Sequence, residues 1–157
     1  MKQILEFTLN GSLVEVLVKP SDTLLDVLRE QLGVTGPKRG CDSGDCGTCT
    51  VLINGKPLRS CLTIALAAAG KEVVTIEGVE KNGELDPLQK AFHEHGASQC
   101  GFCTSGMIVT AKALLEKSPN PSRDEIVEYM SGNLCRCGTY VEVIEAIQSV
   151  ASDEGKE

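Results

Sequence analysis

Residues 40–49 read GCDSGDCGTC, and the rest of the chain is organised to hold the cysteines of this stretch in place. It spaces Cys41, Cys46 and Cys49 as Cys-x4-Cys-x2-Cys, and Cys61 follows at a distance. The glycines between and beside these cysteines allow tight backbone turns: Gly40, Gly44 and Gly47. A tightly curled loop points N–H groups inward, where they stabilise a negatively charged group. The stretch therefore predicts a site held by four thiolates.

The Cys-x4-Cys-x2-Cys spacing is typical of plant-type ferredoxins, in which four thiolates hold a [2Fe-2S] cluster. Iron bridged by sulfide takes soft, anionic ligands, and thiolate is the side chain that supplies them. A zinc site and a disulfide-closed loop are the alternatives. Zinc sites usually use paired Cys-x2-Cys units, unlike three close cysteines and one distant one. The spacing favours a cluster with these ligands: Cys41, Cys46, Cys49 and Cys61.

Composition limits the classes of function. Eight cysteines in 157 residues is a high proportion, and no secretory signal segment opens the chain. We therefore expect a cytoplasmic protein whose reduced thiols bind metal. The net charge of −7 argues against a nucleic-acid partner, because phosphate binding needs a basic surface. No apolar run approaches the roughly 18 residues of a membrane-spanning helix.

Alternating hydrophobicity in the first half predicts a small mixed sheet packed on one helix. Residues 3–9 and about 13–19 alternate on either side of Asn10-Gly11, which is a strong hairpin signal. Leucines at helical spacing predict a helix over about residues 24–32. The later elements expected in this half are a second hairpin, a short helix and a final strand, at residues 51–60, 62–69 and 73–76.

The second half has helical periodicity only, which makes the predicted fold class α+β. Residues 1–76 are expected to form the sheet domain and residues 86–150 a domain of four helices. Residues 77–85 hold two glycines and three acidic residues without a clear period, which predicts a linker. The polar residues 151–157 are expected to form a mobile tail.

A second set of cysteines lies in the helical half: Cys100, Cys103, Cys135 and Cys137. Each pair precedes a predicted helix, and two helices joined by a proline-rich turn separate the pairs. An antiparallel helix pair returns the chain to its start, so both cysteine pairs should meet at one end of a bundle. Helix N-termini suit an anionic site. The sequence predicts a second metal site, for which spacing alone leaves zinc and iron–sulfur both open.

Three segments, GCDSGDCGTCTV, QCGFCTSGMI and GNLCRCGTY, resemble the small iron–sulfur subunit of the molybdenum hydroxylases in their order and separation. That family includes xanthine dehydrogenase, aldehyde oxidoreductase, CO dehydrogenase and 4-hydroxybenzoyl-CoA reductase. The resemblance extends to about residue 149. It implies a β-grasp plant-type ferredoxin domain followed by a four-helix bundle domain, each with one [2Fe-2S] cluster.

The resemblance also implies a role and partners. The chain would be a non-catalytic electron-transfer subunit without a substrate site. It would relay electrons between a molybdenum–pterin cofactor on a large subunit and a flavin, FAD, on a medium subunit. The family suggests a dimer of heterotrimers, which is a heterohexamer. The substrate and the direction of electron flow would depend on the partner subunits.

Site residues follow from the same resemblance. It assigns the cluster nearer molybdenum to the second cysteine set and the outer cluster to the first. It places Gln99 and Cys137 against the pterin, where a glutamine amide can donate and accept hydrogen bonds; a surface or capping role is the plainer alternative for Gln99. The chain departs from the common family pattern at Thr48, at Ser105 and at Gly138-Thr139. None of these departures removes a ligand, but the swapped Gly138-Thr139 leaves the pterin contacts open.

Two other classes of protein compete with this interpretation. A free-standing ferredoxin that shuttles between partners would need only the sheet half. A structural zinc protein would be colourless, whereas iron–sulfur clusters give a red-brown protein with acid-labile sulfide. The sequence contains neither G-x-G-x-x-G nor a P-loop, so no nucleotide site is predicted.

Overall fold

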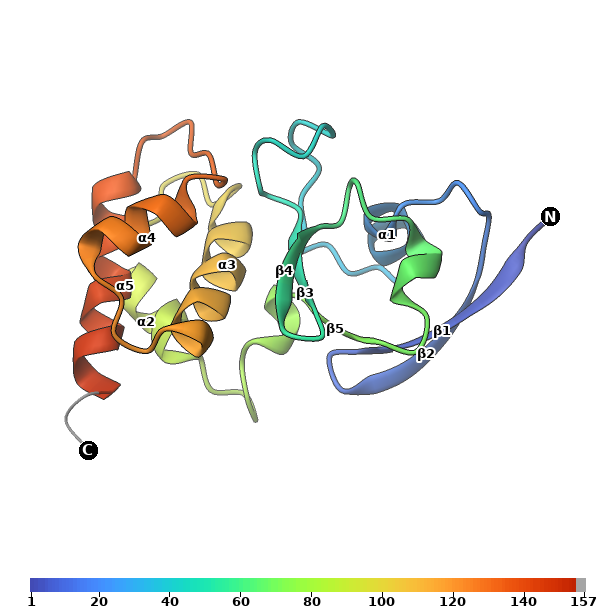
Figure 1. The fold of residues 1–157 in the computed structure, drawn as a ribbon, viewed down its shortest axis with the longest axis horizontal. Helices are drawn as coiled ribbons and strands as arrows, with labels where there is room; N and C mark the ends of the chain where they lie inside the picture. Colours follow the sequence, from blue (N-terminus) through green and yellow to red (C-terminus); the bar gives the residue numbers. More distant parts are fainter. Residues whose placement is uncertain (155–157) are drawn as a thin grey trace.

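A computed structural model describes the backbone of residues 1–154 and the side chains of residues 1–151. It has a half built on a mixed sheet and a helical half, which lie side by side (Figure 1). The strand order is β2-β1-β5-β3-β4, with β1 parallel to β5 and the other pairs antiparallel. The strands are β1 (Gln3–Leu9), β2 (Ser12–Val18), β3 (Thr50–Ile53), β4 (Lys56–Arg59) and β5 (Glu72–Val74). The predicted α+β class with a ferredoxin-like sheet is confirmed.

The first hairpin forms as the sequence predicts. β1 and β2 pair from Gln3 opposite Val18 to Leu9 opposite Ser12, so the turn falls on Asn10-Gly11. Both turn residues have positive φ, 49° and 84°, which a two-residue turn between twisted strands requires. The alternate residues of β1 that face the core are buried: Leu5, Phe7 and Leu9.

The helix expected over residues 24–32 has two parts. α1 (Leu24–Asp26) continues into η1 (Val27–Gln31), a wider π-helical turn. This helical segment is buried on two of its faces. Leu25 packs against cysteines on one face, whereas Leu24 and Leu28 pack on the sheet on the other. A capping box starts α1, since the Thr23 hydroxyl accepts from the Asp26 N–H and the Asp26 carboxylate accepts from the Thr23 N–H.

The elements that complete the sheet half are shorter than predicted. The hairpin of β3 and β4 turns at Asn54-Gly55. The short helix expected at residues 62–69 is the 3-10 helix η2 (Ala65–Ala68), because Ile64 is still extended. β5 ends at Val74, and η3 (Ile76–Gly78) follows as one 3-10 turn.

The stretch predicted as a linker, residues 77–85, is partly packed. Val79 is 1% exposed and belongs to the core of the helical half. Just before it, Thr75 is tied to Asn10 by two hydrogen bonds of 2.9 Å, from the Thr75 N–H to Asn10 Oδ1 and from Asn10 Nδ2 to Thr75 Oγ1. The sequence did not predict the burial of Val79 or the hydrogen bonds of Thr75, because this stretch has no regular hydrophobic period. The division into two separate domains stays a prediction.

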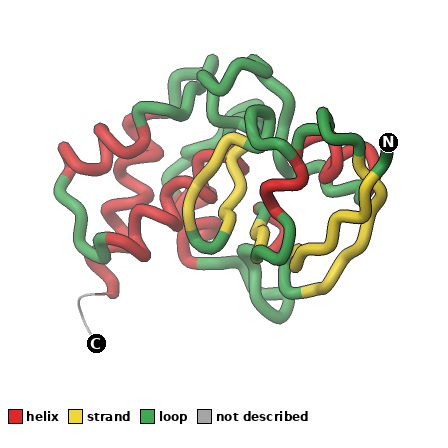
Figure 2. The backbone as a smooth tube through the Cα atoms, turned by 45° about the vertical axis from the view of Figure 1, so that its right-hand side comes forward, coloured by secondary structure: helices red, strands yellow, loops and turns green. Residues whose placement is uncertain are grey.

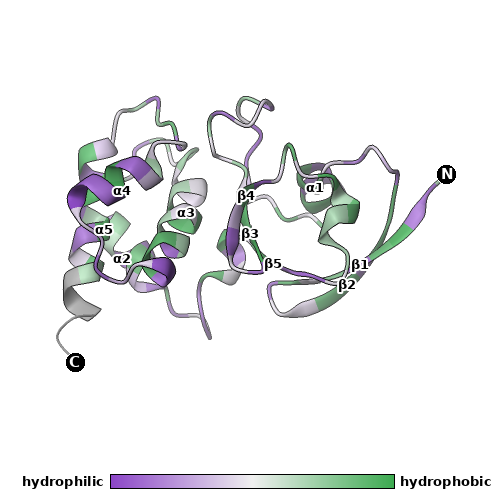
Figure 3. Ribbon diagram, viewed as in Figure 1, coloured by the Kyte–Doolittle hydropathy of each residue, from purple (hydrophilic) through white to green (hydrophobic). Residues whose placement is uncertain are grey.

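The helical half contains the four helices that periodicity predicts. They are α2 (Pro87–Glu94), α3 (Thr104–Lys117), α4 (Arg123–Met130) and α5 (Tyr140–Glu154). Asp86 and Ser122 cap α2 and α4. Figure 3 shows hydrophilic and hydrophobic residues alternating around α4 and α5, the pattern of helices with one buried side. Their apolar faces meet around Met107, Ile126 and Ile147, which are almost fully buried.

The last helix is longer than predicted. It passes residue 150 and continues to Glu154, because Val150 and Ala151 extend its apolar stripe and are buried. Of the predicted mobile tail, residues 151–154 are therefore helical. The remainder, residues 155–157, lies outside the described residues.

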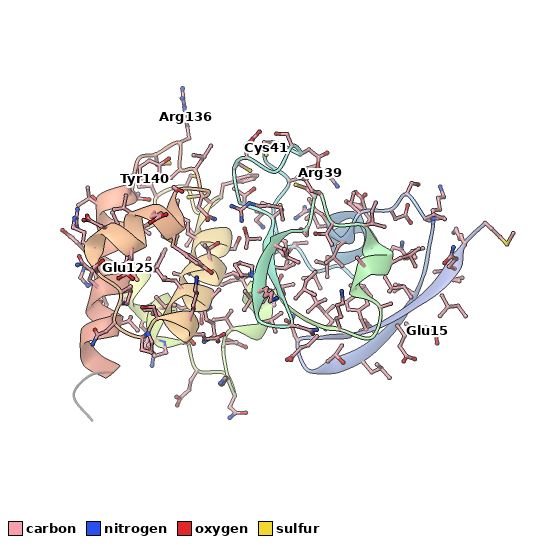
Figure 4. The ribbon with its side chains drawn as sticks, viewed as in Figure 1. Glu15, Arg39, Cys41, Glu125, Arg136 and Tyr140 are labelled. Atoms are coloured by element: carbon pink, nitrogen blue, oxygen red, sulfur yellow. The ribbon has the colours of Figure 1, made fainter. Side chains whose placement is uncertain are left out.

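The two halves are joined by direct packing as well as by the chain. Figure 2 shows the helices against the strands of β3 and β4, and Leu52 of β3 is buried in the core of the helical half. Arg59 Nη2 donates to the carbonyl oxygen of Gly132 at 2.7 Å, and Ser105 Oγ donates to that of Gly36 at 2.8 Å. This packing brings the two cysteine-bearing regions to the same side of the molecule, the side on which Figure 4 labels Cys41 and Arg136.

Candidate metal centres

The first cysteine loop curls around its own sulfur atoms. Cys41 Sγ accepts the N–H groups of Ser43 and Cys46 at 3.4 and 3.3 Å, and Cys46 Sγ accepts the N–H of Cys41 at 3.4 Å. Cys41 and Cys46 therefore form one pair. Cys49 and Cys61 form another beneath them: both are buried, and both pack on Leu25. The inward N–H groups expected from a glycine-rich loop are present.

The surroundings of these thiols favour opposite charge states. The Ser43 hydroxyl and the N–H groups of Cys46 and Ser43 lower the pKa of Cys41 to about 6. Burial, together with the neighbouring Cys49 thiol, raises the pKa of Cys61 to about 11. Four thiolates this close together repel one another unless cations offset their charge. A bound metal supplies that positive charge and deprotonates the thiols that coordinate it. This donor set fits an iron–sulfur cluster.

The three glycines predicted to shape the loop have separate reasons to be glycine. Gly44 and Gly47 have φ of +85° and +76°, the left-handed region that side chains disfavour. Gly40 has an ordinary backbone, but a Cβ there would lie 2.8 Å from Cys46 Sγ. The space beside the sulfur is therefore open only to glycine.

The second set of cysteines gathers at one end of the helical half, as the sequence predicts. Cys103 stands at the N-cap of α3, and the segment before α5 supplies Cys135 and Cys137. The thiol of Cys103 contacts that of Cys135, and the thiol of Cys100 contacts that of Cys137. The first of these pairs is buried and the second is exposed.

Burial and hydrogen bonding act differently on the buried pair. Burial, reinforced by the adjacent Cys135 thiol, raises the pKa of Cys103 to about 12. Burial also opposes ionisation of Cys135, yet hydrogen bonds from the hydroxyl and N–H of Thr139 lower the pKa of that thiol to about 7. Hydrogen bonds from its own loop therefore stabilise the thiolate form of Cys135.

Each set of four cysteines is made of two pairs of neighbouring thiols. Across the described part of the chain, no three Cys, His, Asp or Glu side chains converge where one metal ion would sit. Within each set the two pairs are also close to each other, since the charge of Cys41 acts on Cys61 and that of Cys100 acts on Cys103. A cluster of two irons takes two thiolates on each iron, so this arrangement suits [2Fe-2S] better than a mononuclear zinc site.

One cavity of about 400 Å³ joins the two sets. Both cysteine regions line it: Cys46 and Thr48 from the first, and Cys100, Cys103 and Cys135 from the second. Beside it the Leu134 N–H donates to the carbonyl oxygen of Cys46 at 2.9 Å. This hydrogen bond joins the backbone segments that carry the two sites.

Gln99 and Cys137, which the resemblance places against a pterin, are both exposed. Gln99 precedes Cys100, whose thiol contacts Cys137, so both residues belong to the exposed side of the second site. Their assignment to the pterin stays a prediction.

Several residues that contact these sites were not predicted from the sequence. Tyr140 occupies an apolar position of α5 by periodicity, yet it is 42% exposed and its hydroxyl accepts the Cys135 N–H at 2.8 Å. Asn133 Nδ2 donates to the carbonyl oxygen of Gly47 at 3.2 Å. The departures at Thr48 and Thr139 were the only local signals, because each puts a hydroxyl 3.3 Å from a cysteine sulfur.

Comparison with known protein families matches both halves. Residues 7–75 match the 2Fe-2S iron-sulfur cluster binding domain, and residues 75–148 match the [2Fe-2S] binding domain. The chain is 46% identical to the nicotinate dehydrogenase small FeS subunit of Eubacterium barkeri, over 94% of each chain.

Solved structures agree with this match. The quinoline 2-oxidoreductase of Pseudomonas putida 86 has a chain with a TM-score of 0.94 and 48% identity, covering 98% of this chain and 95% of that one. The aldehyde oxidoreductase of Desulfovibrio gigas matches with a TM-score of 0.93 and 42% identity, over 99% of this chain but only 18% of its own. The same fold therefore occurs as a separate chain and as part of a longer one. None of the described helices meets the length and hydropathy of a membrane span.

Proposed function

The chain belongs to the small iron–sulfur subunits of the molybdenum hydroxylase family, and we propose that its two cysteine quartets are the electron path of such an enzyme. It is a non-catalytic electron-transfer subunit of a molybdenum-cofactor oxidoreductase and holds two [2Fe-2S] clusters. Each cluster, when bound, takes up and passes on one electron at a time.

The proposed ligands follow the two quartets. The outer cluster is held by Cys41, Cys46, Cys49 and Cys61. The inner cluster is held by Cys100, Cys103, Cys135 and Cys137. The pairing of thiols within each quartet is the observation that carries this assignment, because two irons require two thiolates each. The shared cavity and the bond between Leu134 and Cys46 keep the two sites adjacent.

The chain's own residues bind the clusters and exclude water from one side of them. Gly40, Gly44 and Gly47 let the first loop wrap its cluster, with N–H groups aimed at sulfur. Leu25 seals the buried side of that site, and the helical core seals the buried side of the other. Each cluster keeps one exposed side, through which an electron can enter or leave.

The exposed side of the second site is the proposed contact with a large molybdopterin subunit. Gln99 and Cys137 would meet the pterin there. Around them Phe102, Leu134 and Tyr140 are 47%, 50% and 42% exposed, an apolar surface that a partner would cover. The first site would face a medium subunit that carries FAD, with Leu62, 61% exposed, beside Cys61. We further propose a cytoplasmic dimer of heterotrimers.

Purification of the native complex tests this function. The expected result is co-purification with two larger chains and about four irons per molybdenum, all from the two clusters of this chain. Changing Cys103 to serine should remove one cluster and changing Cys49 to serine the other, each seen as loss of one EPR signal. A colourless chain containing zinc, or a brown monomer without molybdenum, would contradict the proposal.

A further inference from the structure

A buried hydroxyl is directed at one sulfur of the second site. Thr139 Oγ1 lies 3.3 Å from Cys135 Sγ, and Thr139 is only 2% exposed. Thr139 immediately precedes α5, and its carbonyl oxygen accepts the first helical bond, from the Val143 N–H. Its hydroxyl is not used to cap that helix: within the described residues, Cys135 Sγ is its one hydrogen-bond partner.

The chemistry of a ligand thiolate decides which atom donates. A cysteine bound to iron has lost its proton, so Cys135 Sγ can only accept, and Thr139 must donate. A donor aimed at a thiolate stabilises negative charge, and more strongly where burial lowers the local dielectric constant. The stabilisation grows when the site gains an electron, because part of the added charge resides on the ligand sulfur.

We propose that Thr139 is a positioning residue that raises the reduction potential of the second cluster through its hydrogen bond to Cys135. The inference rests on the proposed function, since it requires Cys135 to be a ligand. One electron enters the cluster from a neighbouring redox centre of the complex and one leaves to the next. No bond to Thr139 forms or breaks, and its proton stays on its oxygen.

The first loop contains a similar but weaker arrangement. Thr48 Oγ1 also lies 3.3 Å from a ligand sulfur, that of Cys46, and Thr48 is buried. Its single hydrogen has a second acceptor, however, because Thr48 Oγ1 donates to the carbonyl oxygen of Lys38 at 3.1 Å. Thr48 therefore shares its hydrogen, whereas Thr139 gives its hydrogen to sulfur alone. We therefore expect Thr139 to raise the reduction potential of the second cluster by more than Thr48 raises that of the first.

Redox titration of the full holo-chain, followed by EPR, tests the inference with Thr139→Val, which replaces the hydroxyl by a methyl group of similar size. The equilibrium constant for one-electron reduction of one cluster should fall about tenfold, a shift of about 59 mV to lower potential. Thr139→Ser should keep the wild-type midpoint, and Thr48→Val should move only the other cluster, by less. Thr110→Val is the matched control, since Thr110 is equally buried but bonds the carbonyl oxygen of Gly106.

The outcomes separate this inference from the proposed function. A wild-type chain without iron and sulfide would overturn the function itself. An unchanged midpoint in Thr139→Val, with its iron and sulfide complete, would overturn only the inference. If Thr139→Val does not assemble its cluster, Thr139→Ala is titrated instead. Loss of the cluster in both, with retention in Thr139→Ser, would assign the hydroxyl to assembly and overturn its role in the potential.

Discussion

Gly106 of α3 lies directly against the backbone of Gly47 in the first cysteine loop. A Cβ on Gly106 would stand 2.2 Å from the carbonyl oxygen of Gly47, a distance no real Cβ contact reaches. The helix that begins at the second cysteine site therefore packs on the backbone of the first. This contact, with the bond from Asn133 Nδ2 to the same oxygen, sets how the two sites stand relative to each other.

Gly106→Ala should destabilise the junction of the two halves. The new methyl group meets main-chain atoms that cannot rotate away, and such overpacking costs about 1–3 kcal/mol. Thermal or urea unfolding of the holo-chain should show a lower free energy of unfolding, with weakened spin–spin coupling between the reduced clusters. Ser105→Ala, one residue earlier, removes one hydrogen bond to Gly36 and should cost about 1 kcal/mol. Equal stability of Gly106→Ala and the wild-type chain would contradict the packing argument.

Arg59→Lys should loosen the same junction from the other side. Arg59 donates from Nη1 to Thr50 Oγ1 at 2.8 Å and from Nη2 to the Gly132 carbonyl oxygen at 2.7 Å, and one ammonium cannot match this fork. Leaving one acceptor without its donor should cost about 1–3 kcal/mol in urea unfolding. Arg123→Lys, at an exposed position, is the control and should change little. A loss no larger than that of the control would show that Arg59 does not hold the halves together.

Asp26 should make stability depend on pH in the acid range. Its pKa is lowered, first by the Thr23 hydroxyl and further by the Thr23 N–H and the Arg39 guanidinium, while burial opposes the shift. The stabilisation is present above the ordinary carboxyl pKa of the unfolded chain and is lost as pH falls through the lowered folded pKa. Asp26→Asn should therefore cost about 0.5–1 kcal/mol at neutral pH, a modest value because solvent screens this half-exposed group.

Urea unfolding at several pH values measures this dependence. The difference between the wild-type chain and Asp26→Asn should shrink as the solution becomes more acid than an ordinary carboxyl pKa. Glu80→Gln, an exposed site, should show no such trend. A difference that stays constant with pH would mean that Asp26 acts by shape and not by charge.

Removal of the metal should destabilise the two cysteine sites more than the sheet. Four of the proposed ligands are buried: Cys49, Cys61, Cys103 and Cys135. Without iron, these buried thiols lose the metal bonds that stabilise the folded site. The apo-chain prepared with a chelator should have a lower melting temperature than the holo-chain, whereas amide exchange of the β1–β2 hairpin should change little. The strands of the hairpin pair with each other, and the core on which they pack contains none of the cysteines. Equal melting of the two forms would contradict a structural role for the clusters.

The sequence alone was enough for features that depend on local chemistry. Asn10-Gly11 specified a turn with positive φ, alternation specified β1 and β2, and caps at Asp86 and Ser122 specified where α2 and α4 begin. Cysteine spacing was enough to predict the first site, because three of its proposed ligands are close along the chain. The two [2Fe-2S] family matches, over residues 7–75 and 75–148, confirm that both halves are of the expected kind.

Tertiary structure decided everything that depends on contacts between distant residues. The second cysteine set left zinc and iron–sulfur open from spacing, and only the pairing of Cys103 with Cys135 and of Cys100 with Cys137 favoured two irons. The expected linker contained a buried Val79, because burial there depends on helices that follow it. The contact of Gly106 with Gly47 has no local signature at all, since a glycine that makes room for another segment looks like any other glycine in sequence. Local interactions are encoded residue by residue, whereas the placement of two clusters depends on packing that appears only when the halves meet.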